Sequence, residues 1–285
     1  MQLIEWPQFL EDTLPFGGEP SAMTVGVFDG VHRGHQTLIE RIIAHNDGTV
    51  PVAVTFRQSQ FKNNHGAGRE FPGNILSLRQ KLNIFEGMGV SITIIIDFSE
   101  SFRRMSGRDF FRILQEHGKM RFLAVGSNFR CGYQLDTDVP AIQKLNACRD
   151  IPTDVVQPLV HGDEPISSSK IRSAITRSDL KAAVAMLGRP FTVDLSGASV
   201  SPYKKADGKT DGNIADGSIA DGSGAAYDIA GQGRLLPPPG RYPVFLLEKD
   251  GAQNTKKPAE ILVEGGNIII GGDLAGTGPE YVEFI

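Results

Sequence analysis

Residues 23–43 read MTVGVFDGVHRGHQTLIERII, and this stretch decides the fold around it. Its first part, residues 23–28, is short, apolar and rich in β-branched residues, which predicts a buried strand. Asp29-Gly30 is a turn signal, and from about His32 onward the apolar residues recur at helical spacing. The stretch therefore predicts a strand, a tight glycine-containing turn and a helix with two histidines in its first turn.

This turn has the features of an anion-binding site. Unpaired backbone N–H groups and the positive end of the helix dipole point at whatever lies above the strand. His32 and His35 are three residues apart and share one helix face, while Gly26, Gly30 and Gly34 let phosphates approach the backbone without meeting a Cβ atom. Two exposed histidines near a helix start are the alternative, but the strand and the flanking glycines favour a functional role.

The glycine spacing argues against two common nucleotide-binding classes. Gly26, Gly30 and Gly34 are four residues apart, so the dinucleotide-binding pattern G-x-G-x-x-G is absent. The P-loop pattern G-x-x-x-x-G-K-[ST] is absent as well. A dinucleotide-dependent dehydrogenase and a P-loop kinase are therefore disfavoured.

Three ordered motifs resemble one known family. Residues 26–35, GVFDGVHRGH, closely resemble the signature of the bacterial FAD synthetases, the riboflavin kinase/FMN adenylyltransferase proteins of the H-x-G-H nucleotidyltransferase superfamily. Residues 125–132, VGSNFRCG, resemble the family's V-G-x-[DN]-F-R-F-G, with Cys131 in place of the usual phenylalanine. Residues 166–172, ISSSKIR, resemble I-S-S-[ST]-x-[IV]-R. The resemblance covers roughly residues 10–190.

The resemblance implies transfer of AMP from ATP to FMN, with Mg²⁺ accompanying ATP, to give FAD and pyrophosphate. The implied catalytic residues are His32, His35 and Arg172. The implied ATP-binding residues are Gly26, Phe28, Asp29, Gly30, Gly34, Ser167, Ser168, Ser169 and Lys170. The implied flavin-binding residues are Phe56, Arg57, Asn128, Phe129 and Arg130. No protein ligand is assigned to the metal.

The residue types suit these roles, although each has a structural alternative. Lys170 and Arg172 supply positive charge and donors for a polyphosphate, and the three serines before them are equally good helix N-caps. Asn128 can donate to and accept from a flavin's imide edge, or it can cap a helix. The segment Arg57-Gln58-Ser59 stands where the family usually has Pro-His-Pro, which leaves Phe56 as the stacking face.

Strands and helices alternate through the first two thirds of the chain. Buried strands are expected over residues 50–56, 91–97 and 122–126, with helical spacing over 77–87 and a phenylalanine-rich core segment over 98–118. This order predicts an α/β fold with a Rossmann-like parallel sheet. We assign residues 1–187 to this nucleotidyltransferase domain, which ends with a helix closed by Gly188.

Residues 188–285 are expected to form a small all-β, barrel-like domain. In the resembled family a riboflavin kinase barrel follows, which opens with a glycine-rich segment ending in G-F-P-T-A-N. Asp-Gly pairs between 207 and 222 stand in its place, so the kinase chemistry is expected to be missing and residues 205–225 to form a flexible loop. A calcium site is disfavoured because the D-x-[DN]-x-[DN]-G-x₅-E spacing is absent.

Other functions remain open at this point. The H-x-G-H motif alone allows another acceptor, such as nicotinamide mononucleotide, phosphopantetheine or a sugar phosphate. A diverged tail that still phosphorylates riboflavin would make the protein bifunctional. A third alternative is a flavin or nucleotide sensor without catalysis, which the presence of His32, His35 and Arg172 argues against.

Composition gives the broad class of the protein. The 285 residues are 40% hydrophobic with a net charge of −4, and no basic stripe suggests a nucleic-acid partner. No segment approaches a membrane span, the first residues lack a signal-peptide pattern, and two cysteines are too few for a disulfide framework. A soluble cytoplasmic protein with small-molecule substrates is expected, and the oligomeric state is left open.

Overall fold

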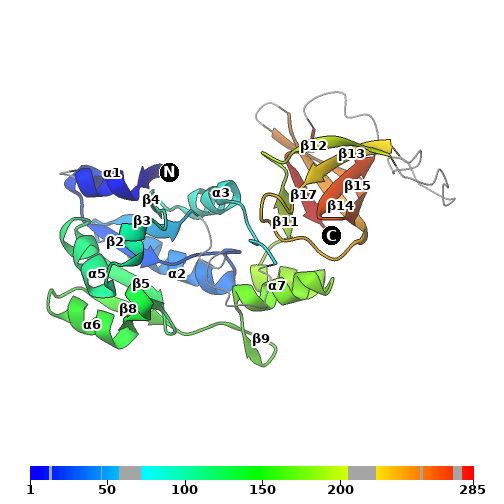
Figure 1. The fold of residues 1–285 in the computed structure, drawn as a ribbon. Helices are drawn as coiled ribbons and strands as arrows, with labels where there is room; N and C mark the ends of the chain where they lie inside the picture. Colours follow the sequence, from blue (N-terminus) through cyan, green and yellow to red (C-terminus); the bar gives the residue numbers. More distant parts are fainter. Residues whose placement is uncertain (13–14, 46, 58–71, 205–222, 251–252, 272–277) are drawn as a thin grey trace. The chain divides into compact units, whose positions relative to one another are not determined.

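The computed structural model describes residues 1–285 except 13–14, 46, 58–71, 205–222, 251–252 and 272–277 (Figure 1). The chain forms two compact units. The first comprises Met1–Ala67 and Leu78–Ile166, and the second comprises Gly68–Ser77 and Ser167–Ile285, each as far as it is described.

Within the described residues, the first unit is built on a parallel sheet of six strands (Figure 1). The strands are β1 (Gln2–Glu5), β2 (Ser21–Val25), β3 (Val50–Phe56), β4 (Ile92–Ile96), β5 (Met120–Gly126) and β8 (Thr153–Val156). Their order is β1-β4-β3-β2-β5-β8, and all paired strands are parallel. Helices lie between them in the chain, so the predicted Rossmann-like α/β class is confirmed.

The two faces of this sheet carry different side chains, because alternate strand residues point to opposite faces. One face carries large residues such as Met23 and Val54, which join one apolar core with phenylalanines of the covering helices. The other face carries small residues such as Thr24 and Ala53, which are fully buried. The helices of the unit are α1 (Trp6–Glu11), α2 (Arg33–Ala44), α3 (Leu78–Met88), α4 (Glu100–Arg103), α5 (Gly107–Glu116) and α6 (Val139–Ala147).

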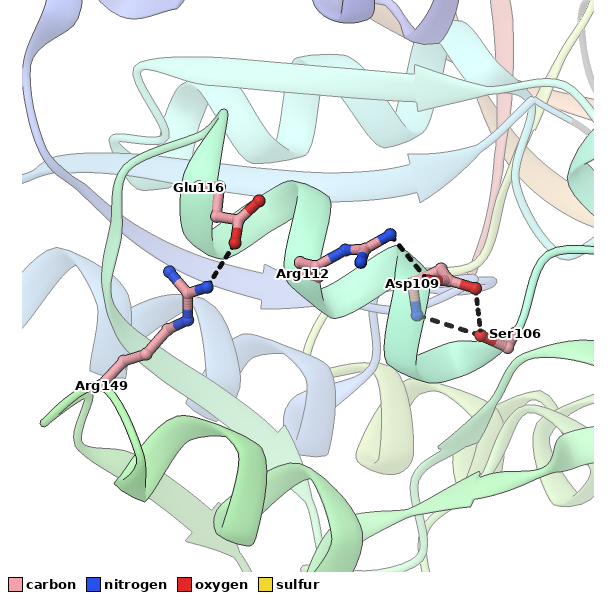
Figure 2. A network of polar contacts seen from close by, with 5 residues as sticks. All are labelled: Ser106, Asp109, Arg112, Glu116 and Arg149. Carbon is pink, nitrogen blue, oxygen red and sulfur yellow. Dashed lines mark hydrogen bonds and ion pairs between the residues drawn. The ribbon is translucent and has the colours of Figure 1, made fainter.

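The phenylalanine-rich segment over 98–118 forms two helices, α4 and α5, because Ser106 starts a new one (Figure 2). The Ser106 hydroxyl accepts from the Asp109 N–H at 3.1 Å and donates to the Asp109 carboxylate at 2.7 Å. Arg112 pairs with Asp109 one turn further on, at 2.9 Å. At the far end of α5, Glu116 pairs with Arg149. As predicted, the phenylalanines of this segment belong to the core.

The second unit contains helices α7 (Ser168–Thr176) and α8 (Leu180–Leu187) and an antiparallel sheet. Its strands are β11 (Thr192–Asp194), β12 (Val200–Lys204), β13 (Ser223–Asp228), β14 (Gly240–Asp250), β15 (Gln253–Glu264), β16 (Asn267–Gly271) and β17 (Tyr281–Phe284). Among the described residues they form one curled sheet in the order β11-β17-β14-β15-β16-β13-β12 (Figure 1). A small all-β domain was predicted here and is confirmed.

Residues 72–77, which we call the strap, belong to this second unit although the chain then continues into α3 of the first. The Asn74 N–H donates to the Gly233 carbonyl, and the Leu235 N–H donates to the Asn74 carbonyl, each at 2.9 Å. The Ser77 hydroxyl donates to the fully buried Asp194 carboxylate at 2.6 Å. The strap therefore adds backbone pairing to the β-rich unit.

The compact units divide after Ile166, which groups α7 and α8 with the second unit. The domain boundary after residue 187 was predicted from the extent of the sequence motifs, and it stays a prediction. Of the Asp-Gly loop predicted over 205–225, residues 205–222 lie outside the described residues, and the last three begin β13.

Candidate active site

The predicted site lies at the topological switch point of the parallel sheet. From β2 the chain adds β3 and then β4 on one side, and later adds β5 and then β8 on the other. Open α/β sheets bind ligands outside the carboxyl ends of their strands at such a point. The predicted residues that follow β2, β3 and β5 therefore share one edge of the sheet.

The turn after β2 is held in an unusual conformation. The strand ends at Val25 rather than at the predicted residue 28, and Phe28, with a φ of 51°, is not in the extended conformation. Gly30 and Val31 also have positive φ, at 85° and 35°. A Cβ atom on Gly26 would lie 3.1 Å from the Phe28 ring, which folds back over it. Such conformations cluster at binding sites, where the surrounding structure must stabilise them.

Phe28 is the packing centre of this turn. Its ring is 1% exposed and meets the ring of Phe85 from α3 edge to face, with centroids 5.4 Å apart. It meets the His35 ring in the same way at 5.2 Å. Phe28, predicted to contact ATP, therefore also packs against one predicted catalytic histidine and fixes one side of its position.

The two histidines are stacked. Their ring centroids are 3.6 Å apart with an interplanar angle of 20°. His32 is the N-cap of α2 rather than part of its first turn, because its Nδ1 accepts from the His35 N–H at 3.3 Å. Since Nδ1 accepts, a neutral His32 carries its proton on Nε2, which makes Nε2 the donor atom of the ring. A Cβ atom on Gly34 would lie 3.3 Å from the His32 ring, so this glycine lets the ring lie close to the backbone.

Two buried residues, Lys81 and Thr55, hold the backbone of the turn through hydrogen bonds. Neither was identified from the sequence as a site residue. The Lys81 ammonium from α3 donates to the Val27 and Phe56 carbonyls, and Thr55 in β3 donates to the same Val27 carbonyl. The available signal was the spacing of Lys81, which is three residues after Leu78 and four before Phe85 and so shares the apolar face of the helix. Without the tertiary structure, however, such a lysine is assigned to the solvent face.

The predicted flavin residues differ in their surroundings. Phe56 is buried and stacks on Phe98 at 4.7 Å, and Phe129 packs edge to face against Phe111. Arg57 pairs with Glu5 at 2.5 Å and Asp97 at 2.9 Å, and its hydrogen bond to Glu5 raises the pKa of its guanidinium. Asn128 is exposed in the turn after β5, and Arg130 is exposed in the short strand β6 (Arg130–Cys131). Gln58 and Ser59 lie outside the described residues, and the flavin-binding role of all five residues stays a prediction.

The serine–arginine motif lies in the second unit. Ser167 is the N-cap of α7 and accepts from the Lys170 N–H at 3.3 Å, so the structural alternative for this serine is present. Arg172 is buried, and its Nε donates to the Gly73 carbonyl of the strap at 3.0 Å. Ser168 lies in the first turn of α7, followed by the exposed Ser169. The convergence of this motif with the histidines on one ATP stays a prediction.

Two features are absent from the part of the chain that the structure describes. In that part, no three histidine, cysteine, aspartate or glutamate side chains are grouped so that they could hold a metal ion. No described helix is both long and apolar enough to cross a membrane.

The arrangement after β2 suits group transfer between phosphates. It combines the N-terminus of a twelve-residue helix, two stacked imidazoles and a turn of positive-φ residues. Phosphoryl-type transfer depends on positioning and charge stabilisation more than on covalent chemistry by the protein.

Comparisons with known proteins agree with this chemistry. A family model described as FAD synthetase matches residues 17–170. The bifunctional riboflavin kinase/FMN adenylyltransferase of Escherichia coli strain K12 is 30% identical over 179 residues, and that of Buchnera aphidicola from Acyrthosiphon pisum is 28% identical over 178. Each match covers 61% of this chain and 56% of the relative, so the matched part spans little more than half of these relatives.

A similar fold occurs in a solved structure. A macrolide-efflux protein from Streptococcus pneumoniae aligns over 100% of this chain and 89% of its own, with a TM-score of 0.71. The two sequences are 20% identical, so this likeness concerns the fold alone.

Proposed function

The chain belongs to the FAD synthetase family, and from this premise we propose that it is an FMN adenylyltransferase. It transfers AMP from ATP to FMN and yields FAD and pyrophosphate. The observation that carries the proposal is the stacked pair of His32 and His35 at the N-terminus of α2, at the switch point of the sheet.

In the proposed reaction an oxygen of the FMN phosphate attacks the α-phosphorus of ATP. The new P–O bond forms as the bond between the α-phosphorus and the bridging oxygen breaks, and pyrophosphate leaves. His35 and His32 donate to the phosphates, and His35 stabilises the charge that develops at the α-phosphorus. No enzyme nucleophile is needed when ATP and FMN are held in line.

The remaining phosphate contacts come from the serine–arginine motif and from magnesium. Lys170 and Arg172, with Ser167, Ser168 and Ser169, hold the β- and γ-phosphates of ATP. The nucleotide substrate is the magnesium complex of ATP, since Mg²⁺ is commonly bound through substrate phosphates and water with few protein ligands. Asp29, Gly30 and Gly34 of the turn after β2 lie beside the same phosphates, and Gly26 acts indirectly by leaving space for the Phe28 ring.

The first test is a direct assay of the purified protein. FMN with magnesium and ATP is expected to give FAD and pyrophosphate in equal amounts, measured by chromatography and a phosphate assay. Riboflavin with ATP, run in parallel, is expected to give no FMN. Pyrophosphate release with nicotinamide mononucleotide, phosphopantetheine or a sugar phosphate, but not with FMN, would contradict the proposed acceptor.

The second test removes one imidazole. His35→Ala is expected to lower kcat by about 100-fold or more while the protein stays folded, because loss of one preorganised donor to a developing oxyanion costs this much. His45→Ala is the matched control: His45 lies at the other end of α2, stacked on Phe122 at 4.1 Å, and this variant is expected to keep its activity. Unchanged turnover in folded His35→Ala would rule out the proposed role.

A further inference from the structure

Lys81 lies in α3, outside the three motifs, and is almost entirely buried in the first unit with an exposed fraction of 6%. Its ammonium group donates to the Val27 carbonyl at 2.9 Å, to the Phe56 carbonyl at 3.0 Å and to the Thr55 hydroxyl at 3.1 Å. An ammonium has three N–H donors and no acceptor. The three described acceptors therefore match its full donor capacity.

These acceptors join the ends of two neighbouring strands. Val27 belongs to the turn that follows β2, and Phe56 is the last residue of β3. Thr55 donates to the same Val27 carbonyl at 3.2 Å, so the hydroxyl and the ammonium converge on one oxygen. This oxygen directly precedes the positive-φ residue Phe28.

Helix α3 contacts the turn at a second point, one helical turn further on. Phe85 meets the ring of Phe28, and the Phe28 ring in turn meets the imidazole of His35. Lys81 thus fixes the backbone of the turn, and Phe85 fixes the side chain that lies between α3 and the histidine. Both contacts come from the same face of one helix, since the residues are four apart.

From this geometry we propose that Lys81 is a positioning residue of the adenylyl-transfer site. Its ammonium holds the turn after β2 and the end of β3 in the conformation that places His35 on the α-phosphate. The proposal rests on the proposed function for its role in turnover, and on the described contacts alone for its effect on the His35 ring.

The electrostatics of the site agree with a positioning role. Burial lowers the pKa of Lys81 to about 8, and the buried carboxylate of Asp29 opposes this shift by attraction. Lys81 is therefore mostly protonated at neutral pH. A protonated amine is what its three donated hydrogen bonds require. Removal of the ammonium takes one donor from the Val27 carbonyl, one from the Phe56 carbonyl and one from the Thr55 hydroxyl, and the loss of buried hydrogen bonds is costly.

The main experiment compares two lysine variants. Lys81→Met is expected to lower kcat by about 10- to 100-fold with the KM for ATP within threefold of wild type, because a small displacement of a catalytic group costs this much. Lys119→Met is the matched control, since Lys119 donates to the Gly18 carbonyl at 2.7 Å just before β5, at the opposite edge of the sheet. Its kcat is expected to stay within twofold.

A threonine pair keeps the proposal testable if Lys81→Met does not fold. Thr55→Val removes the hydroxyl that Lys81 contacts, and Thr24→Val removes an equally buried hydroxyl that donates to the Ala124 carbonyl at 2.9 Å. The first is expected to lower kcat three- to tenfold and the second by less than twofold. Folded Lys81→Met with kcat within threefold of wild type, or equal losses in the two valine variants, would overturn the proposal.

A spectroscopic readout separates this proposal from the proposed function. Imidazole resonances of His35, followed by ¹H–¹⁵N correlation spectra without substrate, are expected to move in Lys81→Met and Thr55→Val and to stay in place in Thr24→Val. Wild-type protein that makes no FAD would refute the proposed function alone. Unmoved His35 resonances in both folded variants would refute the role of Lys81, whatever the reaction.

Discussion

At the scale of single residues, the space around Gly26 predicts the effect of one methyl group. A Cβ atom there would lie 3.1 Å from the Phe28 ring, and that ring is held between Phe85 and His35. We expect Gly26→Ala to lower kcat three- to tenfold and to lose about 1 kcal/mol of stability, because the ring must shift. Urea denaturation and FAD formation measure the two effects.

The control for this variant is another glycine of the first unit. Gly87 lies in α3, and an added Cβ would meet nothing within 4 Å. Gly87→Ala is expected to gain about 0.5–1 kcal/mol of stability with unchanged activity, since alanine is the better helix former. Equal behaviour of the two variants would show that the Phe28 contact does not restrict residue 26.

The two cysteines are expected to differ sharply in reactivity. Burial raises the pKa of the Cys131 thiol to about 12, with Asp136 adding to the shift, whereas Cys148 is exposed. At pH 8 the reactive thiolate of Cys131 is therefore present at only about one part in ten thousand. Titration with a chromogenic disulfide is expected to detect one thiol quickly and the second only after unfolding, and two fast thiols would contradict this.

At the scale of secondary-structure elements, the start of α5 depends on one hydroxyl (Figure 2). Ser106 caps the helix through the Asp109 N–H, and Ser106→Ala is expected to cost about 1 kcal/mol of stability. Ser99→Ala, which removes the corresponding cap of the four-residue α4, is expected to cost less because less structure depends on it. Thermal unfolding of both variants measures the difference. A greater loss of stability in Ser99→Ala than in Ser106→Ala would contradict this prediction.

Some secondary-structure elements could be predicted from the sequence and others could not. The strand over 50–56 was predicted with its observed bounds, because buried parallel strands are continuous apolar runs with clear turn signals around them. The split between α4 and α5 was missed, since the apolar spacing continues through a capping serine. Strand β8, whose residues are all partly exposed at the edge of the sheet, lacks such a run and was not predicted.

At the scale of the whole molecule, the order of strands and helices in the sequence was enough to predict that the segments after β2, β3 and β5, with their candidate residues, share one edge of the sheet. The contacts that hold the turn after β2 could not be predicted in this way. Lys81 reaches a carbonyl 54 residues earlier in the chain, and no local pattern encodes that pairing. The strap was missed for the same reason, because its hydrogen-bond partners near residue 234 follow more than 150 residues later. Sequence periodicity predicts which residues are buried, whereas these contacts depend on the tertiary fold.

The strap provides a prediction about the stability of the second unit. Gly73 has a φ of 117°, and an added Cβ would lie 2.6 Å from the backbone carbon of Arg234 and 2.7 Å from the nitrogen of Leu235. Backbone atoms cannot rotate away as a side chain can. Gly73→Ala is therefore expected to break the pairing between the strap and this backbone.

Gly162→Ala separates that clash from the ordinary cost of a positive φ. Gly162 has a φ of 61° and nothing within 4 Å of an added Cβ, so its variant reports only the backbone strain, about 1 kcal/mol. Gly73→Ala is expected to cost at least about 1 kcal/mol more, and hydrogen exchange of the Asn74 and Leu235 amides should become faster in this variant alone. Equal losses of stability with unchanged exchange would contradict this prediction, because the clash would then have been absorbed without breaking either hydrogen bond.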